Sequence, residues 1–381
     1  MVGEIFSRVP LTSLGAVRST CKTWEALSRN HILGQKAARK SQFLEFMVKD
    51  FRVYSLRLDL QGVRNDELAD ASAKQISVPN HKVHTIHHFD GLFLFYPEGK
   101  DHSRLLVWNP YSGQTKLVKT TKSFCTFDAF ALGYTDDNKN RNHKILRLFN
   151  SDYLNKGGPM EDHTEVYEFS TESWRVLDLD LNKLDTASGV SLKGNAYFFS
   201  HDITFEDGGG YAIDYERFLV CFDFTRERFG PRMPVPFHHE YPSIEIVSLY
   251  CVRDEKLAVL CSHEDTPEKI EIYISTTVEP NAVSWNTFLK LDLSLINGLP
   301  DGFPKDFSPL SFFIDEENKV AVFLDLDIIN QHKYCYYEMV YIFGEDGFFK
   351  FVNTGLVWSP RTNPGMLVCS SYVSSLVQLR V

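Results

Sequence analysis

The chain has 381 residues, of which 43% are hydrophobic and 24% charged, and its formal net charge is −10 at pH 7. This length allows a full hydrophobic core, and the composition is typical of a folded globular protein. No apolar run approaches the roughly 20 residues that a transmembrane helix needs, so we expect no membrane partner.

Charge is distributed unevenly along the sequence. Residues 1–40 hold seven of the 40 Lys and Arg residues but two of the 50 Asp and Glu residues, so this segment carries +5 and the remainder −15. A basic end would suit an acidic partner, although the solvated faces of two helices explain the charge more simply. Phosphate contacts need clustered Lys and Arg, so we expect no nucleic-acid partner for the acidic remainder.

The cysteines and the N-terminal residues indicate the compartment. The seven cysteines are scattered and include no Cys-x-x-Cys pair, which argues against a disulfide framework and a zinc site. Glu4 and Arg8 interrupt the N-terminus, which therefore does not resemble a signal peptide. We expect an intracellular protein of the nucleus, the cytoplasm or both.

The first 27 residues predict two short helices that are separated by Pro10, because proline cannot continue a helix. The apolar stripe of the first helix consists of Val2, Ile5, Phe6 and Val9. The stripe of the second helix consists of Leu14, Val17, Cys21, Trp24 and Leu27. Forty residues are too few for a core of their own, so these helices must pack on the rest of the chain or on a partner.

The stretches "EIFSRVP" and "VRSTCKTWEAL" resemble the F-box, whose helices bind an acidic Skp-family adaptor within a cullin–RING ubiquitin ligase. The resemblance assigns adaptor binding to Ile5, Val9, Pro10, Leu14, Val17, Cys21 and Trp24. The family's Leu-Pro-x-Asp segment is missing ahead of residue 2, so the resemblance implies an N-terminally truncated F-box over residues 1–40. We expect adaptor binding to survive this truncation in weakened form.

From residue 41 onward the sequence predicts short strands joined by polar turns. The clearest strand pairs cover residues 105–118, 165–179, 220–233, 270–291 and 339–352. In all but the first pair an aromatic residue follows the turn, namely Trp174, Phe229, Trp285, and Phe348 or Phe349. Four short strands at a period near ~50 residues are typical of a kelch-like propeller blade, with a pair of β-sandwiches as the alternative.

Two further predicted strands, over residues 53–62 and 371–379, lie at opposite ends of this β region. A propeller closes its ring by pairing strands from both ends of the chain, because an open edge invites aggregation. We therefore expect these segments to share one closing blade. The predicted fold is mainly β, a kelch-like β-propeller of about six blades, with five as the alternative, preceded by a small α-helical domain.

The stretches "VWNPYSGQTK", "EVYEFSTESWRVLD" and "CFDFTRERFGP" resemble successive motifs of the plant F-box-associated (FBA type 1) domain. Similar motifs continue in order from residue 43 to residue 380. The resemblance implies a propeller-like domain over residues 41–381 that presents a surface for binding another protein.

The sequence offers little that would support catalysis or a cofactor. It contains no P-loop, no G-x-G-x-x-G and no G-x-S-x-G motif. The pairs His87-His88 and His238-His239 are poor metal ligands, because adjacent strand residues point to opposite faces. We predict no catalytic residue, no cofactor and no metal.

Together the two resemblances imply the substrate-recognition subunit of an SCF-type (Skp–cullin–F-box) ubiquitin ligase. The helical end would bind the adaptor and, through it, a cullin, while the propeller would bind an unknown target protein. The contribution of such a subunit is proximity rather than chemistry. The alternative is a stand-alone interaction propeller with a degenerate, non-docking F-box, and a propeller hydrolase is the least favoured class.

Overall fold

The structure is a computed structural model, and strands make up most of what it describes. The described residues are 22–23, 42–49, 52–60, 70–76, 83–97, 102–110, 112–124, 128–137, 140–149, 164–179, 189–205, 212–237, 244–253, 255–263, 266–299, 303, 311–328, 335–358, 367–369 and 379. Of the predicted helical segment, only Lys22 and Thr23 belong to this set, and both are helical and exposed.

The described strands form six four-stranded antiparallel sheets. The first sheet contains, in order, β24 (Leu367–Cys369), β1 (Gln42–Lys49), β2 (Arg52–Asp59) and β3 (Asp70–Ile76). The second contains β4 (Val83–Phe89), β5 (Leu92–Pro97), β6 (Arg104–Trp108) and β7 (Thr115–Lys119). The third contains β8 (Ala129–Asp137), β9 (Asn140–Leu148), β10 (Thr164–Glu168) and β11 (Ser173–Leu177).

The remaining three sheets follow the same order of strands. The fourth contains β12 (Gly189–Leu192), β13 (Asn195–Phe205), β14 (Ala212–Asp223) and β15 (Arg228–Phe229). The fifth contains β16 (Ile244–Val252), β17 (Lys256–His263), β18 (Thr266–Glu279) and β19 (Ala282–Asp292). The sixth contains β20 (Ser311–Asp315), β21 (Val320–Ile328), β22 (Cys335–Gly344) and β23 (Phe349–Trp358). Two short 3-10 turns are η3 (Leu293–Leu295) and η4 (Glu345–Gly347).

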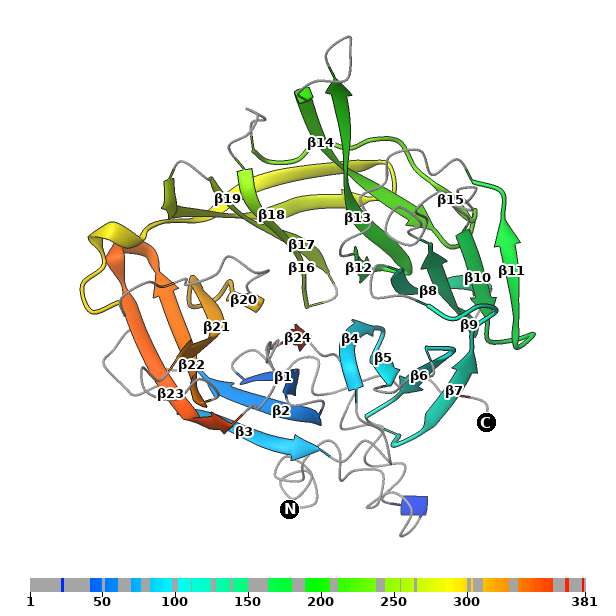
Figure 1. Ribbon diagram of the computed structural model, residues 1–381, viewed down its shortest axis with the longest axis horizontal. Helices are drawn as coiled ribbons and strands as arrows, with labels where there is room; N and C mark the ends of the chain where they lie inside the picture. Colours follow the sequence, from blue (N-terminus) through cyan, green and yellow to red (C-terminus); the bar gives the residue numbers. More distant parts are fainter. Residues whose placement is uncertain are drawn as a thin grey trace.

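The six sheets stand around a common centre as the blades of a propeller (Figure 1). Their innermost strands, β4, β8, β12, β16, β20 and β24, each contact the next one around the ring. The predicted β-propeller is therefore confirmed, and the described strands give the larger of the two expected blade numbers. The alternative of two β-sandwiches is wrong, because every sheet is one member of a single ring.

The ring closes through the first blade, where the last described strand of the chain joins the first. β24 pairs antiparallel with β1, with Phe46 opposite Cys369 and Val48 opposite Leu367. The expected pairing between the two ends of the β region is thus confirmed, but the closing strand is 367–369. The predicted strand 371–379 lies outside the described residues, except for Leu379, which is buried.

The aromatic residues that follow the turns join neighbouring blades. The indole Nε1 of Trp174 on β11 donates to the carbonyl oxygen of Lys119 at the end of β7, at 2.7 Å. Trp285 on β19 makes the equivalent bond to the carbonyl oxygen of Pro234, which follows β15, at 3.0 Å. Each tryptophan is half-buried and satisfies its polar N–H on the preceding blade. Two of the four aromatic residues recognised after turns in the sequence therefore link neighbouring blades.

Candidate interaction surfaces

The residues expected to bind the adaptor cannot be placed. Ile5, Val9, Pro10, Leu14, Val17, Cys21 and Trp24 all lie outside the described residues. The part of the chain that the structure describes is almost entirely the propeller, whose blades carry the candidate surfaces.

The order of strands gives the propeller two unlike faces. In a four-stranded meander the first and third turns lie at one end, while the second turn and the link to the next blade lie at the other. The first and third turns of blades two to six are short, spanning 90–91, 109–114, 138–139, 169–172, 193–194, 224–227, 253–255, 280–281, 316–319 and 345–348. We call this end the tight-turn face and the opposite end the long-connection face.

The tight-turn face is where the N-terminal segment joins the propeller. β24 takes the innermost place in the first blade, so β1 is its second strand. Second strands start at the tight-turn face, and β1 therefore starts there, at Gln42. Residues 1–41 are consequently attached to the propeller at the tight-turn face, and the long-connection face is the one directed away from this attachment.

Left-handed backbone conformations are concentrated on the tight-turn face. The non-glycine residues with positive φ are Asp90, Glu172, Lys193, Glu227, Arg253, Lys319 and Asp346, and all of them lie in its short turns. Positive φ is unfavourable for side chains as long as Glu, Lys and Arg. All seven residues carry a charge, and five of them form ion pairs that offset part of the backbone cost, namely Asp90, Glu172, Glu227, Arg253 and Lys319.

Ion pairs from these turns connect neighbouring blades. Asp90 of the second blade pairs with Arg141 of the third, and its Oδ2 lies 2.9 Å from Nε2 of His143. Burial alone would raise the pKa of Asp90, but the bond to His143 and the charges of His143 and Arg141 bring that pKa below its usual value. The carboxylate is therefore held charged as a structural clamp and is a poor general base.

Two glutamates repeat this arrangement further round the ring. Glu172 of the third blade pairs with Lys116 of the second at 2.5 Å. Glu227 of the fourth blade pairs with Lys144 of the third at 2.6 Å, and also with Arg175. Burial would raise the pKa of Glu227, but these two cations lower it overall. The three acidic side chains Asp90, Glu172 and Glu227 of the tight-turn face thus form ion pairs between blades.

A different polar cluster lies at the long-connection face, between the second and third blades. Arg147 on β9 is completely buried and donates to Asp128 Oδ2 from Nε at 3.0 Å and from a terminal nitrogen at 2.7 Å. Its other hydrogen bonds reach the carbonyl oxygens of Lys122 and Ser123, at 3.0 and 3.2 Å. Arg147 therefore fixes the connection from β7 to β8, where sequence analysis had predicted no site.

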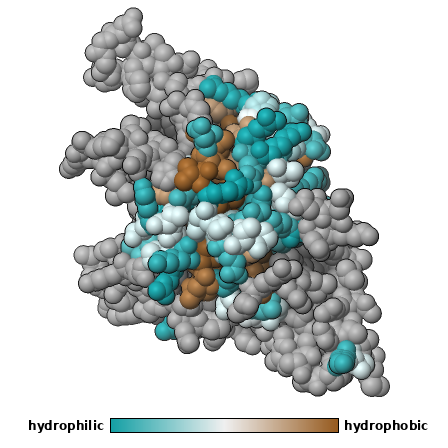
Figure 2. All heavy atoms as spheres, turned by 90° about the vertical axis from the view of Figure 1, so that its right-hand side faces the viewer, coloured by the Kyte–Doolittle hydropathy of each residue, from teal (hydrophilic) through white to brown (hydrophobic). Residues whose placement is uncertain are grey.

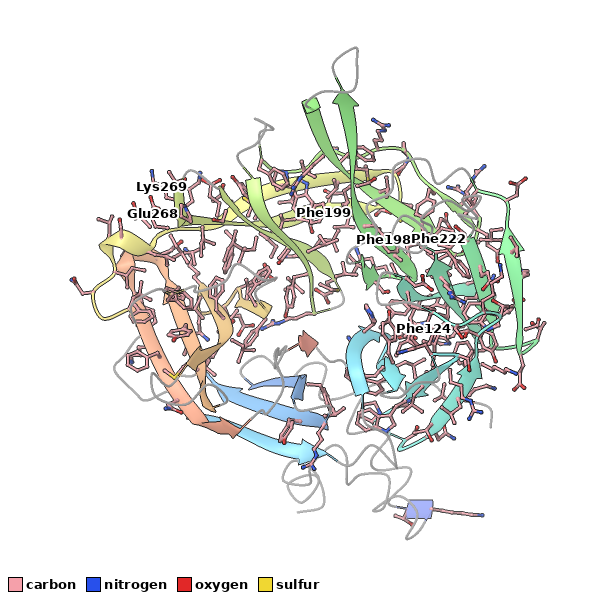
Figure 3. All side chains as sticks on the ribbon, in the orientation of Figure 1. Phe124, Phe198, Phe199, Phe222, Glu268 and Lys269 are labelled. Carbon is pink, nitrogen blue, oxygen red and sulfur yellow. The ribbon has the colours of Figure 1, made fainter. Side chains whose placement is uncertain are left out.

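An aromatic side chain fixes the same connection from the other side. Phe124 is buried, and its backbone N–H donates to the carbonyl oxygen of His102 at 2.7 Å. Its ring packs against Tyr96 and Phe130, with centroids 5.4 and 5.7 Å apart (Figure 3). Residues 122–124 of the connection are thus held against the core between the second and third blades. The role of Arg147 was hard to recognise in the sequence, because an arginine within an alternating strand pattern is normally expected to be exposed.

The histidine pair on β4 is part of the core packing. Nε2 of His87 lies 3.2 Å from the hydroxyl oxygen of Tyr96, whereas Nε2 of His88 accepts a hydrogen bond from the backbone N–H of Gly91 at 3.2 Å. The two rings thus have separate partners, as expected for adjacent strand residues. Within the described ranges, no group of three or more His, Cys, Asp or Glu residues could hold a metal ion.

Thiol chemistry is also disfavoured at the described cysteines. Burial raises the pKa of Cys221 and Cys261 to about 12, so both thiols stay protonated and behave as small apolar side chains. No helix among the described residues is both long and apolar enough to cross a membrane.

Exposed apolar side chains are few on the described surface. The large ones are Leu117, Val176, Leu295 and Phe351. Val176 on β11 is 62% exposed and belongs to the rim between the second and third blades. Figure 2 looks onto the side where β7 and β11 lie in Figure 1, and shows small hydrophobic areas enclosed by hydrophilic side chains.

Comparison with known proteins identifies the family of the chain. The family model described as the F-box associated beta propeller domain matches residues 44–379, and the F-box domain model matches residues 1–36. The chain belongs to the F-box proteins with an F-box-associated propeller. In this F-box protein the propeller match starts within β1 and ends at the buried Leu379, so it spans all six described sheets.

Relatives that match the chain over its full length occur in Arabidopsis thaliana. The F-box protein At3g49510 is 52% identical over 389 residues, which cover 100% of this chain and 97% of that protein. The F-box protein At1g54550 is 50% identical, with 100% and 97% covered, and the F-box/kelch-repeat protein At3g13680 is 47% identical, with 100% and 95% covered. The similarity of this F-box protein to these relatives therefore extends over the whole chain.

Proposed function

We propose that this protein is the substrate-recognition subunit of an SCF-type E3 ubiquitin ligase. Residues 1–40 bind a Skp-family adaptor and, through it, a cullin, and the propeller over residues 41–381 binds a target protein. The observation that supports this proposal is the pairing of an F-box match at residues 1–36 with a propeller match at 44–379 in one chain. The protein acts inside the cell and makes or breaks no bond itself.

The two unlike faces of the propeller suit the separate binding of an adaptor and a target protein. The N-terminal segment joins at the tight-turn face, where Asp90, Glu172 and Glu227 are engaged with neighbouring blades. The long-connection face is directed away from the attachment point, and the rim lies between the two faces. We therefore place target binding on those surfaces.

Proximity is the mechanism by which such a subunit acts. A target held on the propeller experiences a high effective concentration near the ubiquitin-charged enzyme, and the gain depends on how stiffly the two ends are connected. The ion pairs and indole hydrogen bonds between blades stiffen the ring. The propeller therefore serves as a rigid spacer as well as a binding surface.

Adaptor binding tests the proposal. Titration of the full chain with a Skp-family adaptor should give a saturable complex, and Trp24→Ala should weaken it by at least about 30-fold, because large aromatic side chains at interfaces often contribute 2 kcal/mol or more. Thr23→Ala is the matched control, since Thr23 is exposed on the same predicted helix. A wild-type chain that does not bind the adaptor would support the alternative, a stand-alone interaction propeller.

A further inference from the structure

The rim between the second and third blades carries a set of cations whose role the function proposed above leaves open. Arg104, Lys119 and Lys122 are exposed at the long-connection end of β6 and β7. Arg104 and Lys119 are directly opposed partners in the β6–β7 pairing. Two cations in this arrangement raise the local positive potential, which favours an anionic ligand that spans both.

The backbone that carries Lys122 is fixed from inside the protein. The completely buried Arg147 donates to the carbonyl oxygens of Lys122 and Ser123, at 3.0 and 3.2 Å. A buried guanidinium costs desolvation energy, which here is offset by Asp128 at 2.7 Å. The arrangement holds an exposed loop in one conformation, and binding surfaces gain affinity from such preorganisation.

Lys119 is fixed in a similar way. Its carbonyl oxygen accepts the hydrogen bond from the indole of Trp174, at 2.7 Å. The Lys119 side chain is exposed, and it forms no ion pair with another described residue. Side chains of the third blade therefore hold the backbone of two of the three cations in place: Arg147 for Lys122 and Trp174 for Lys119.

An exposed hydrophobic side chain lies beside these cations. Val176 is directly opposite Glu165 in the β10–β11 pairing, and the Glu165 carboxylate accepts hydrogen bonds from Oγ1 of Thr121 at 2.6 and 2.8 Å. Directly opposed residues project from the same face of a sheet with Cβ atoms about 5 Å apart. Val176 and Thr121 are therefore both neighbours of Glu165, and Thr121 is the residue that precedes Lys122.

The local charge is opposite in sign to that of the protein. Arg104, Lys119 and Lys122 are exposed cations at this edge, and Asp178, which follows β11, is an exposed anion. The chain from residue 41 onward carries −15. A positive surface on an acidic body attracts acidic ligands selectively, since the rest of the surface repels them.

We propose that Arg104, Lys119, Lys122 and Val176, here called the basic rim surface, bind an acidic peptide segment of the target protein, with one hydrophobic side chain of that segment against Val176. The proposal rests on the function proposed above and adds the class of segment that is recognised. A nucleic acid fits less well, because its binding requires a longer track of cations or exposed aromatic rings for base stacking.

Short fluorescein-labelled peptides test the basic rim surface in the full chain. One peptide contains Asp, Glu and Leu, a second has Gln in place of every acidic residue, and a third has Lys instead. Fluorescence anisotropy should detect binding of the acidic peptide alone. The triple variant Arg104→Glu, Lys119→Glu, Lys122→Glu should weaken that binding at least about tenfold, since rim charges each contribute modestly. Val176→Asn should weaken it by a smaller factor.

The matched control is the triple variant Lys193→Glu, Arg228→Glu, Lys269→Glu. These three residues are exposed on the fourth and fifth blades, and the variant changes the net charge by the same amount. Its affinity for the acidic peptide should stay within about twofold of wild type if local contacts rather than net charge decide binding. Equal losses in both triple variants, or no loss in the first, would overturn the proposal.

Two further measurements separate the remaining explanations. A short DNA duplex or phosphatidylserine vesicles that bind the basic rim surface more tightly than the acidic peptide would assign it to another class of ligand and overturn the proposal. The Skp-family adaptor is titrated against the same samples. Adaptor binding without peptide binding refutes this inference alone, whereas peptide binding without adaptor binding refutes the proposed function.

Discussion

At the residue scale, two adjacent histidines on the innermost strand β4 are held neutral by their surroundings. Burial lowers the pKa of both His87 and His88 to about 4, and for His88 the nearby Asp90 opposes part of that shift. Nε2 of His88 must also stay unprotonated to accept the hydrogen bond from Gly91. Protonating either ring therefore costs the native fold part of its stability.

The sign of the pH dependence follows from these pKa values. An unfolded histidine titrates near 6.5, so below that pH the unfolded state binds protons that the folded state does not. Stability should fall between pH 6.5 and about 4, by roughly 2 kcal/mol per histidine between pH 7 and pH 5. Urea unfolding at several pH values measures this, and His88→Gln should flatten the profile. His102→Gln, at an exposed histidine, is the control, and an unchanged profile in His88→Gln would contradict the prediction.

Some of these residue roles could be predicted from the sequence and others could not. The alternation of adjacent strand residues predicted that His87 and His88 would have separate surroundings. The sequence also showed that Trp174 and Trp285 follow turns, but not that their indoles bond to the preceding blade. The role of Arg147 could not be predicted. Its partner Asp128 is 19 residues away, at the other end of the β8–β9 hairpin, and its bonds to the carbonyl oxygens of Lys122 and Ser123 depend on how the second and third blades meet.

At the scale of elements, the short turns do more than reverse the chain. Glu172 and Glu227 occupy the same position in the third turns of successive blades, both with positive φ, and both pair with a lysine of the preceding blade. They differ in burial, since the Glu172 side chain is 61% exposed and that of Glu227 19%. The same motif should therefore contribute very different amounts to stability.

A pair of substitutions measures this difference. Glu227→Gln leaves the buried Lys144 without its full counter-charge and should lower the free energy of unfolding by about 2 to 3 kcal/mol. Glu172→Gln breaks an exposed pair and should cost less than about 1 kcal/mol. Urea unfolding of both variants at pH 7 tests the contrast. Equal effects would show that the conformation of the turn, rather than the buried ion pair, determines stability.

The strands were predictable, but the contacts between blades were not. Alternating apolar residues and polar turns locate β6–β7, β10–β11 and β22–β23 close to where the sequence predicted them. Lys144 and Glu227, in contrast, are 83 residues apart, and no local pattern links them. The basic rim surface was missed for the same reason, because Arg104, Lys119 and Lys122 are separated in sequence and the fold brings them to one edge.

At the scale of the whole molecule, closure of the ring depends on the end of the chain in two places. β24 pairs with β1 within the first blade. Leu379 reaches the second blade, where it is buried in the cluster of Phe89, Leu92 and Val107, and its N–H donates to Oε1 of Gln114 at 3.0 Å. The sequence predicted that the two ends meet, but "LVC" at 367–369 is too short to stand out as a strand, so the longer pattern at 371–379 was chosen instead.

These two contacts predict a graded response to truncation. Removing residues 380–381 leaves both contacts in place and should not change stability, while Leu379→Ala should cost about 2 to 3 kcal/mol, as for other buried leucines. Removing residues 367–381 also takes away β24, which exposes the edge of β1 and opens the ring. That variant should unfold at a much lower temperature and aggregate more readily, as measured by calorimetry and light scattering. If it melts like the chain lacking only 380–381, the first blade holds the ring closed without its innermost strand, and closure rests on the contacts between β1 and β4 and between β3 and β23.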